Sequence, residues 1–412
     1  MNRFAKIGIL SLSVIIFGYA GLGHVLGKTG DEKTYRSLTV YGEVLQKIQQ
    51  DYVDEPNMRM VTAGSLHGLL EALDPQSSYL TPREYTEYKQ KISNSGTAET
   101  GMTLSKRFGY IVVVSVVPNS PAQKAGLHGG DILDSVAGFT TRDMSVGQAT
   151  NLLSGQPGTT VRVAIIRHVG VDPQPVDLVR EKLAPQKILS EKIDPDILAL
   201  RLPSLDRGRA DEVRDRILQA EKQGIRKVVL DVRDCGRGEI SEAIAMARLF
   251  LTSGTVSTLA GQTVSRQSFA ADSAKVIWRN PVSVLINAST SGAAEVLASA
   301  IADNRRGDIV GERTFGLASE QKLIPLEDGA AIILTVANYY KADGKSILDE
   351  GVTPTEIVTA QSAGEDSDVG DDDTTGVSNS REVPPEPRPL SPDDPVLRKA
   401  IELLKAPAKK AA

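Results

Sequence analysis

The chain of 412 residues has few of the residue types on which several common sites depend. Its single cysteine, Cys235, excludes an internal disulfide and says nothing about redox compartment. Its four histidines, at positions 24, 67, 128 and 168, are too scattered to form a metal-ligand cluster, so we expect no metal and no cofactor. None lies in the C-terminal half, so a Ser-His-Asp triad is not expected either. Aromatic residues make up only 4% and the net charge is −5, which argues against nucleic-acid binding.

Residues 7–26 also carry no formal charge, apart from a possible one on His24. They follow Arg3 and Lys6. A basic start before an apolar run is typical of a secretory signal or an uncleaved anchor. A run of about 20 residues is just long enough to span a bilayer as a helix. A buried core helix is the alternative interpretation. We expect residues 1–28 to be a signal peptide or membrane anchor, with the rest of the chain exported to the periplasmic or extracytoplasmic face of the cytoplasmic membrane.

The apolar pattern divides the remaining chain into regions. Residues 35–95 carry leucines at near-helical spacing and predict a helical N-terminal region. From 97 to 170 the pattern changes to short β-branched runs such as Ile111–Val114, separated by Gly and Pro turns, with one helix over Val146–Leu153. This second region is therefore expected to be a β-rich domain.

Residues 185–358 alternate between helical and strand patterns. Ala210–Lys222 is amphipathic with a helical period, and Val228–Val232 and Val282–Ile286 are short apolar runs typical of buried strands. A further helix is expected over Ala294–Ala302. This alternation predicts a mixed α/β core whose strands are buried on both faces, so the whole chain is expected to be an α+β or mixed α/β multidomain protein.

The C-terminal part differs in composition. Residues 361–395 are first acidic and then proline-rich, which predicts a disordered, solvated linker. In the last segment, 396–412, Val396–Leu404 has the pattern of a short closing helix, and a basic tail follows it.

Five segments, in chain order, resemble motifs of one known family. They are Leu73–Leu80 (LDPQSSYL), Asn119–Asp131, Leu230–Arg233 (LDVR), Gly311–Gly316 (GERTFG) and Gly351–Pro354 (GVTP). They are similar to the LDPHSxY segment, the PDZ signature, the LDLRxNxGG loop, the GExTFG segment and the closing GVxPD of the C-terminal processing proteases, peptidase family S41. The resemblance implies a PDZ domain over 97–170 and an S41-type α/β core over 185–358.

The resemblance also points to substitutions at the catalytic positions. In the family, a serine in an NGxSASASE-like segment attacks the peptide carbonyl, and a lysine that ends the GExTFGK segment takes its proton. Here the segment Asn287–Glu295 has Gly292 in the nucleophile position, and Leu317 stands in the base position. Glycine has no nucleophilic atom and leucine accepts no proton. Whether the chain is an enzyme therefore stays open.

Other positions of the family site follow from the same resemblance. Gln321 matches the glutamine that orients the lysine, and Asp303 matches an aspartate of the family's helix. Gly236, Arg237 and Gly238 correspond to the glycine loop that offers backbone N–H groups to the oxyanion. Arg237 puts a long cation where the family has the first of two paired glycines.

Ser291, one residue before the family position, is the alternative nucleophile. It lies at the start of a predicted helix, whose N-terminal N–H groups could stabilise an anion. The competing interpretation is that Ser289, Thr290 and Ser291 cap this helix. Lys322 is the nearest replacement base, but it follows Gln321 in a predicted strand and should face the opposite side.

The PDZ segment implies peptide binding that needs no catalysis. Such modules accept an extended C-terminal peptide as an added strand and capture its carboxylate with backbone N–H groups. Gly101, Met102 and Thr103, together with Ala149 and Leu152 on the predicted helix, are the candidates for that groove. A PDZ domain that packs on the core and binds nothing is the alternative.

Two function classes follow from these observations. The first is an exported, membrane-associated pseudoprotease that binds protein or peptide C-termini. The second is an active serine-type endopeptidase that cleaves proteins near their C-termini through Ser291. Gly292 and Leu317 favour the first class, since either substitution alone removes the family mechanism. The expected partners are peptide C-termini and the membrane, and not nucleic acid.

Overall fold

The computed structural model describes residues 31–93, 97–167, 172–359, 390–391 and 393–406. The leader expected over 1–28 and most of the linker expected over 361–395 lie outside these residues. Among the described helices, none has both the length and the hydropathy needed to cross a membrane. The chain divides into two compact units, Met1–Ser65 and Leu66–Ala412.

The N-terminal region consists mainly of three helices. Its helices are α2 (Asp31–Asp51), α3 (Met58–Glu71) and α4 (Pro82–Ser93). Within the first unit, the Tyr41 hydroxyl and Ser65 Oγ lie 2.5 Å apart in a hydrogen bond. Between α3 and α4 the region also contains a strand that the helical pattern did not predict, β1 (Ser78–Leu80), which is fully buried. It pairs antiparallel with β16 (Ala331–Tyr340).

The β-rich domain is a sheet of six strands with two helices. Its strand order is β2-β3-β4-β6-β7, and β5 pairs with β4. The bounds are β2 (Met102–Arg107), β3 (Tyr110–Val116), β4 (Ile132–Val136), β5 (Phe139–Thr140), β6 (Thr160–Ile166) and β7 (Gln174–Val179), with helices α5 (Pro121–Lys124) and α6 (Val146–Leu153). The last strand extends the domain beyond residue 170. Helix α6 has its predicted bounds because Ser145 and Gln148 form a capping box at its start.

The α/β core is built on a second six-stranded sheet of order β17-β14-β13-β10-β9-β8. All neighbouring pairs are parallel except β8 with β9. The strands are β8 (Leu189–Asp194), β9 (Ile197–Arg201), β10 (Lys227–Asp231), β13 (Val282–Ile286), β14 (Asp308–Gly311) and β17 (Glu356–Ile357). The helices are α7 (Arg209–Lys222), α8 (Ile240–Arg248), α9 (Ala293–Asp303) and α10 (Pro395–Lys405).

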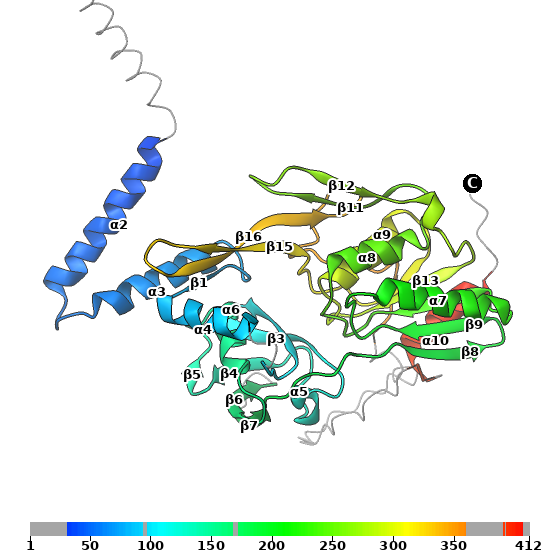
Figure 1. Ribbon diagram of the computed structural model, residues 1–412, viewed down its shortest axis with the longest axis horizontal. Coiled ribbons are helices and arrows are strands. Elements are labelled where there is room, and N and C mark those ends of the chain that lie inside the picture. Colours follow the sequence, from blue (N-terminus) through cyan, green and yellow to red (C-terminus); the bar gives the residue numbers. More distant parts are fainter. Residues whose placement is uncertain (1–30, 94–96, 168–171, 360–389, 392, 407–412) are drawn as a thin grey trace, which may run out of the picture. The chain divides into compact units, whose positions relative to one another are not determined.

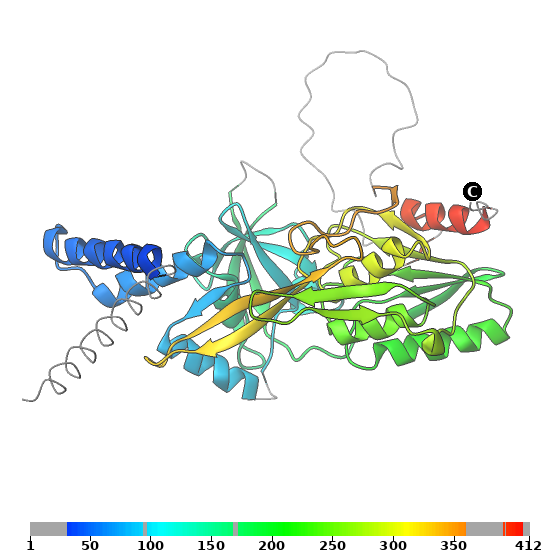
Figure 2. The ribbon, with the colours of Figure 1, turned by 90° about the horizontal axis from the view of Figure 1, so that it is seen from above.

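Helices cover both faces of this sheet, as the apolar strands predict. Alternate strand residues such as Val228 and Val284 pack with α7, α8 and α9 in one buried cluster. The residues between them, such as Val229 and Leu285, pack with Leu397 and other residues of α10 in another. The sheet accordingly lies between α7 and α10 in Figure 2, where α10 is red.

A third sheet, of order β1-β16-β11-β12 with β15 paired to β16, extends from the core. Its other strands are β11 (Thr255–Ala260), β12 (Gln267–Ala270) and β15 (Ser319–Pro325), and the short helix η1 (Ser273–Lys275) follows β12. In Figure 1 the ribbon of β15 and β16 reaches from the core to β1, beside the β-rich domain. The C-terminal helix α10 begins at Pro395, within the segment predicted as linker, because Asp394 caps it and Leu390 is buried.

Candidate functional site

One buried carboxylate joins the two loops that contain Gly292 and Leu317, the residues predicted from the sequence to align with the family's nucleophile and base. Glu295, in the first turn of α9, is fully buried. Its Oε2 accepts hydrogen bonds from the backbone N–H groups of Gly292 and Leu317, each at 2.8 Å. Its Oε1 accepts from Gly316 N at 2.6 Å and from Thr314 Oγ1 at 2.5 Å. The two backbone nitrogens at 292 and 317 therefore lie within twice 2.8 Å of each other.

The environment of Glu295 has two opposing electrostatic effects. Burial raises its pKa, because the ionised form loses its hydration. The donors on Thr314, Leu317, Gly292 and Gly316 act in the other direction, since they stabilise the carboxylate. The backbone N–H groups of residues 292 and 317 thus share one carboxylate oxygen, while the glycine and leucine side chains there have no nucleophilic or basic atom.

Gly292 lies at the junction between β13 and α9 with φ 62° and ψ −118°. A Cβ added at this glycine would meet no atom within 4 Å. Glycine adopts this positive φ without the steric cost that a larger residue has. The position is therefore open in space but constrained in backbone conformation.

The prediction that serine and threonine side chains cap α9 is wrong. Gly292 is the N-cap residue, and no side-chain oxygen of the cap accepts a helix N–H group. Thr290 Oγ1 instead accepts from Asn287 N at 3.0 Å and donates to the Val232 carbonyl at 2.9 Å. The hydroxyl of Thr290 thus braces the turn after β13, and Glu295 satisfies the Gly292 N–H group.

The alternative nucleophile Ser291 is 1% exposed, and its Oγ has no hydrogen-bond partner in the described part of the chain. A Cβ built on Gly236 would lie 3.0 Å from Ser291 Oγ and 2.0 Å from Ser115 Oγ, so β3 of the β-rich domain lies against this point. Lys322 is exposed in β15 and forms no bond to Ser291. A serine without a hydrogen-bonded base is a weak nucleophile.

The glycine loop is held by side chains of the β-rich domain. Thr103 Oγ1 donates to the Gly236 carbonyl at 3.2 Å. Arg237 Nη1 lies 2.9 Å from Glu99 Oε1 in an ion pair. Gly238 has φ 139° and would place a Cβ 2.5 Å from the backbone of Leu205, so only glycine fits there. Arg237 is therefore directed toward Glu99 in this arrangement.

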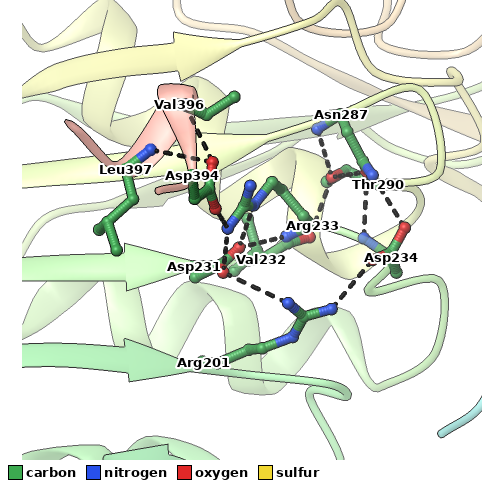
Figure 3. A network of polar contacts seen from close by, with 10 residues as sticks. All are labelled: Arg201, Asp231, Val232, Arg233, Asp234, Asn287, Thr290, Asp394, Val396 and Leu397. Atoms are coloured by element: carbon green, nitrogen blue, oxygen red, sulfur yellow. Dashed lines mark hydrogen bonds and ion pairs between the residues drawn. The ribbon is translucent and has the colours of Figure 1, made fainter. Parts of the chain in front are cut away.

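A polar network at the carboxyl end of β10 connects this loop to α10 (Figure 3). Arg233 Nη2 lies 2.8 Å from Asp231 Oδ2 and 2.6 Å from Asp394 Oδ2. Arg201 Nη2 lies 3.0 Å from Asp234 Oδ2, and Asn287 Nδ2 donates to Asp234 Oδ1 at 2.8 Å. Asp234, which precedes the glycine loop, is thus held by Arg201 at the end of β9 and by Asn287 directly after β13.

Asp231 and Arg233 stabilise each other's charged forms. Burial alone would raise the pKa of Asp231, but attraction to Arg233, with its hydrogen bonds and the nearby Arg201, holds that pKa below its ordinary value. For Arg233, burial acts to lower the pKa and the attraction of Asp231 and Asp394 raises it overall. The ion pair of Asp231 and Arg233 therefore stabilises the carboxyl end of β10, from which the glycine loop follows.

Asp303 and Gln321 do not join the site around Glu295. Asp303 ends α9, and its Oδ2 accepts from Ala342 N at 2.8 Å, while burial raises its pKa. Gln321 Nε2 donates to Ser319 Oγ at 2.7 Å. No hydrogen bond among the described residues connects either side chain to Gly292 or Leu317.

A cavity of about 330 Å³ lies beside α6, and Glu295 is not among its lining residues. Its walls come from α4, α6, the β15–β16 ribbon and the segments around residues 76 and 97. They are Gln76, Tyr88, Lys91, Thr97, Val146, Gly147, Thr150, Asn151, Ser154, Gln321 and Ile333. The structure thus brings Gln321 to this cavity.

The residues predicted for the peptide groove do not line this cavity. Ala149 is fully buried in the core of the β-rich domain, and Leu152 packs against the same core. Gly101, with φ 86°, lies under Ser120, whose Cβ would be 2.3 Å from a Cβ at residue 101. Met102 and Thr103 begin β2, where Met102 packs against the domain core and Thr103 contacts Gly236. A different face of α6 is directed to the cavity.

Lys91 and Asn151 are two cavity residues that the sequence did not indicate. Lys91 Nζ donates to the carbonyl oxygen of Asn151 and, at 2.7 Å, to its Oδ1. Sixty positions separate the two residues, and no local pattern relates them. Nothing in the chain's periodicity could have paired α4 with α6.

Comparisons with known proteins agree with this architecture. Residues 196–358 match peptidase family S41, and residues 112–167 match the PDZ domain. The chain therefore contains a peptidase S41 domain and a PDZ domain, and the predicted family resemblance is confirmed.

Named sequence relatives and a solved structure are similar to most of the chain. The chain is 29% identical to the carboxy-terminal processing protease CtpA of Bacillus subtilis (strain 168), over 84% of this chain and 73% of that protein. It is 28% identical to a carboxy-terminal-processing protease of Bartonella bacilliformis, over 85% and 80%. A solved structure of the photosystem II D1 C-terminal processing protease has the same fold, with a TM-score of 0.65 and 24% identity over 78% of this chain and 92% of that one.

Proposed function

We propose that this S41 homologue lacks Ser–Lys catalysis and acts by recognising protein C-termini. The observation that carries the proposal is the pair Gly292 and Leu317, whose N–H groups bind one oxygen of Glu295. The two positions are close, as a nucleophile and its base must be. Neither side chain has an atom that could attack a carbonyl or accept a proton.

The PDZ domain supports recognition as the remaining role, because such domains bind peptide ends without chemistry. The basic residues before the apolar run 7–26 support a site of action outside the cytoplasmic membrane. Fractionation of the host cell tests this location. Recovery of the full-length chain in the cytoplasmic fraction would contradict it.

An active endopeptidase that uses Ser291 is the competing function. The buried, unpartnered hydroxyl of Ser291 is the observation in its favour. Its 1% exposure and the lack of a hydrogen-bonded base are the observations against it.

One assay separates the two functions. The purified chain is incubated with β-casein and with apolar-ended peptides, and the products are analysed by mass spectrometry, beside the variants Ser291→Ala and Ser299→Ala. Ser299 is the matched control, since it is a buried serine within α9. We expect no cleavage by any of the three. Cleavage that Ser299→Ala retains and Ser291→Ala loses would establish Ser291 as a nucleophile and refute the proposal.

A further inference from the structure

The cavity beside α6 is built from polar groups and has a charge of one sign. Lys91 contributes a cation, and no aspartate or glutamate is among the lining residues. Gln76, Asn151 and Gln321 add carboxamide groups, and Val146 and Ile333 form the apolar part. Such a mixture of an apolar wall with a few convergent polar groups is typical of a ligand site.

Lys91 retains hydrogen-bonding capacity in this cavity. An ammonium group has three N–H donors, and two of them are directed to the carbonyl and side-chain oxygens of Asn151. Among the described residues Lys91 forms no ion pair with a carboxylate. Arg180, whose Nη2 donates to Leu152 O at 2.7 Å, adds a second cation near the same end of α6. The charge of Glu87 also acts on Lys91 and opposes that of Arg180. No hydrogen bond among the described residues gives the third donor of Lys91 a carboxylate partner.

The loop that PDZ domains ordinarily use for a carboxylate is covered in this structure. Thr100 is 2% exposed, and Gly101 lies under Ser120. The side chain of Thr103 is bonded to Gly236 of the peptidase domain. Lys91, which lines the cavity, is therefore the candidate partner of a peptide carboxylate in place of the backbone N–H groups of this loop.

We propose that the cavity accepts the last residues of a peptide and that Lys91 binds its terminal carboxylate. This inference rests on the proposed function, the recognition of protein C-termini, and identifies the group that binds the free carboxylate. The volume of about 330 Å³ is at the lower end of ligand pockets, roughly 300–1,000 Å³, so only the end of the peptide enters. Val146 and Ile333 would contact apolar side chains there.

A structural role is the competing explanation for Lys91. Asn151 lies in the last turn of α6, and a lysine that donates to a carbonyl there stabilises a helix C-terminus. A purely structural lysine would change the stability of α6 but would not distinguish a carboxylate from an amide. The ratio of affinities for two such peptides therefore separates the two roles.

The experiment measures fluorescence anisotropy with the full chain and a fluorescein-labelled hexapeptide ending in Val-Ala-Val, as free acid and as C-terminal amide. We expect the wild-type chain to prefer the acid by about tenfold or more, the usual effect of a hydrogen bond to a charged group. Lys91→Met should lower this ratio to about one. The control is Lys89→Met, since Lys89 is on the same helix with its ammonium over the Tyr85 ring and outside the cavity. It should leave the ratio unchanged.

If Lys91→Met lowers the unfolding temperature, the affinity ratio is measured with Lys91→Gln instead. The glutamine amide can still donate to Asn151 but carries no charge. An unchanged acid preference in the folded variant would overturn the role of Lys91 and leave the proposed function standing. Equal binding of acid and amide by the wild-type chain would likewise overturn it. Failure of the wild-type chain to bind either peptide would count against the proposed function itself.

Discussion

Replacement of Glu295 by glutamine tests whether one carboxylate holds the loops of Gly292 and Leu317 together. The wild-type side chain accepts four hydrogen bonds and donates none. A glutamine has one acceptor oxygen, and its NH₂ group must point at one of the two pairs of donors. The hydroxyl of Thr314 could rotate to accept from this NH₂ group, but the N–H of Gly316 beside it could not.

The magnitude follows from these four contacts. At least one buried N–H group loses its acceptor, which costs about 1–3 kcal/mol. The two N–H groups that keep an acceptor, on Gly292 and Leu317, exchange a charged partner for a neutral one, a difference of about 1 kcal/mol each. We expect Glu295→Gln to lower the free energy of unfolding by about 3–5 kcal/mol, a large part of the about 5–15 kcal/mol typical of a folded protein.

The chain's single tryptophan gives a suitable probe. Trp278 is fully buried in the cluster that includes α7, α8 and α9, so its fluorescence during urea titration reports on the peptidase domain. The control is Glu402→Gln, whose side chain is 69% exposed and should change stability by less than about 0.5 kcal/mol. A loss below about 1 kcal/mol in Glu295→Gln would refute the assigned role of the carboxylate.

Three further predictions concern the same domain and can be followed by the same fluorescence. Gly292→Ser should fold with a loss of about 1–3 kcal/mol from its sparsely populated backbone conformation, since no atom obstructs the side chain. It should not cleave casein while Leu317 is retained, and a loss above about 4 kcal/mol would contradict the open space. Because Arg233 lowers the pKa of Asp231, the stability from this pair is present above the ordinary aspartate value of about 3.9 and is lost as pH falls below it; Asp231→Asn should show a smaller decrease in this range, and an unchanged acid titration would contradict the linkage. Leu397→Ala should cost about 2–5 kcal/mol as the fully buried residue that joins α10 to the sheet, and a loss under about 1 kcal/mol would mean that α10 does not stabilise the domain.

Local features of this protein could be determined from the sequence. The buried strand over Val282–Ile286 and the helix over Val146–Leu153 have the bounds that their apolar patterns predict. Such patterns are local, because the period of a strand or helix is set by its own backbone. That residue 292 is glycine and residue 317 is leucine is also read directly from the sequence, and their alignment with the family's nucleophile and base stays a prediction.

The contacts that relate these elements were decided only by the tertiary structure. Glu295 reaches across to Leu317, Asp394 to Arg233, and Lys91 to Asn151, and each pair is separated by many residues. A periodic pattern identifies an apolar face but not the element that covers it, so neither α10 on the second face of the sheet nor the cavity beside α6 could be inferred. The residues that cap α9 were predicted wrongly because a tertiary contact, and not the local sequence, decides them. Serine and threonine are good caps in isolation, but here the buried carboxylate of Glu295 occupies the N–H group of Gly292, and Thr290 braces the neighbouring loop.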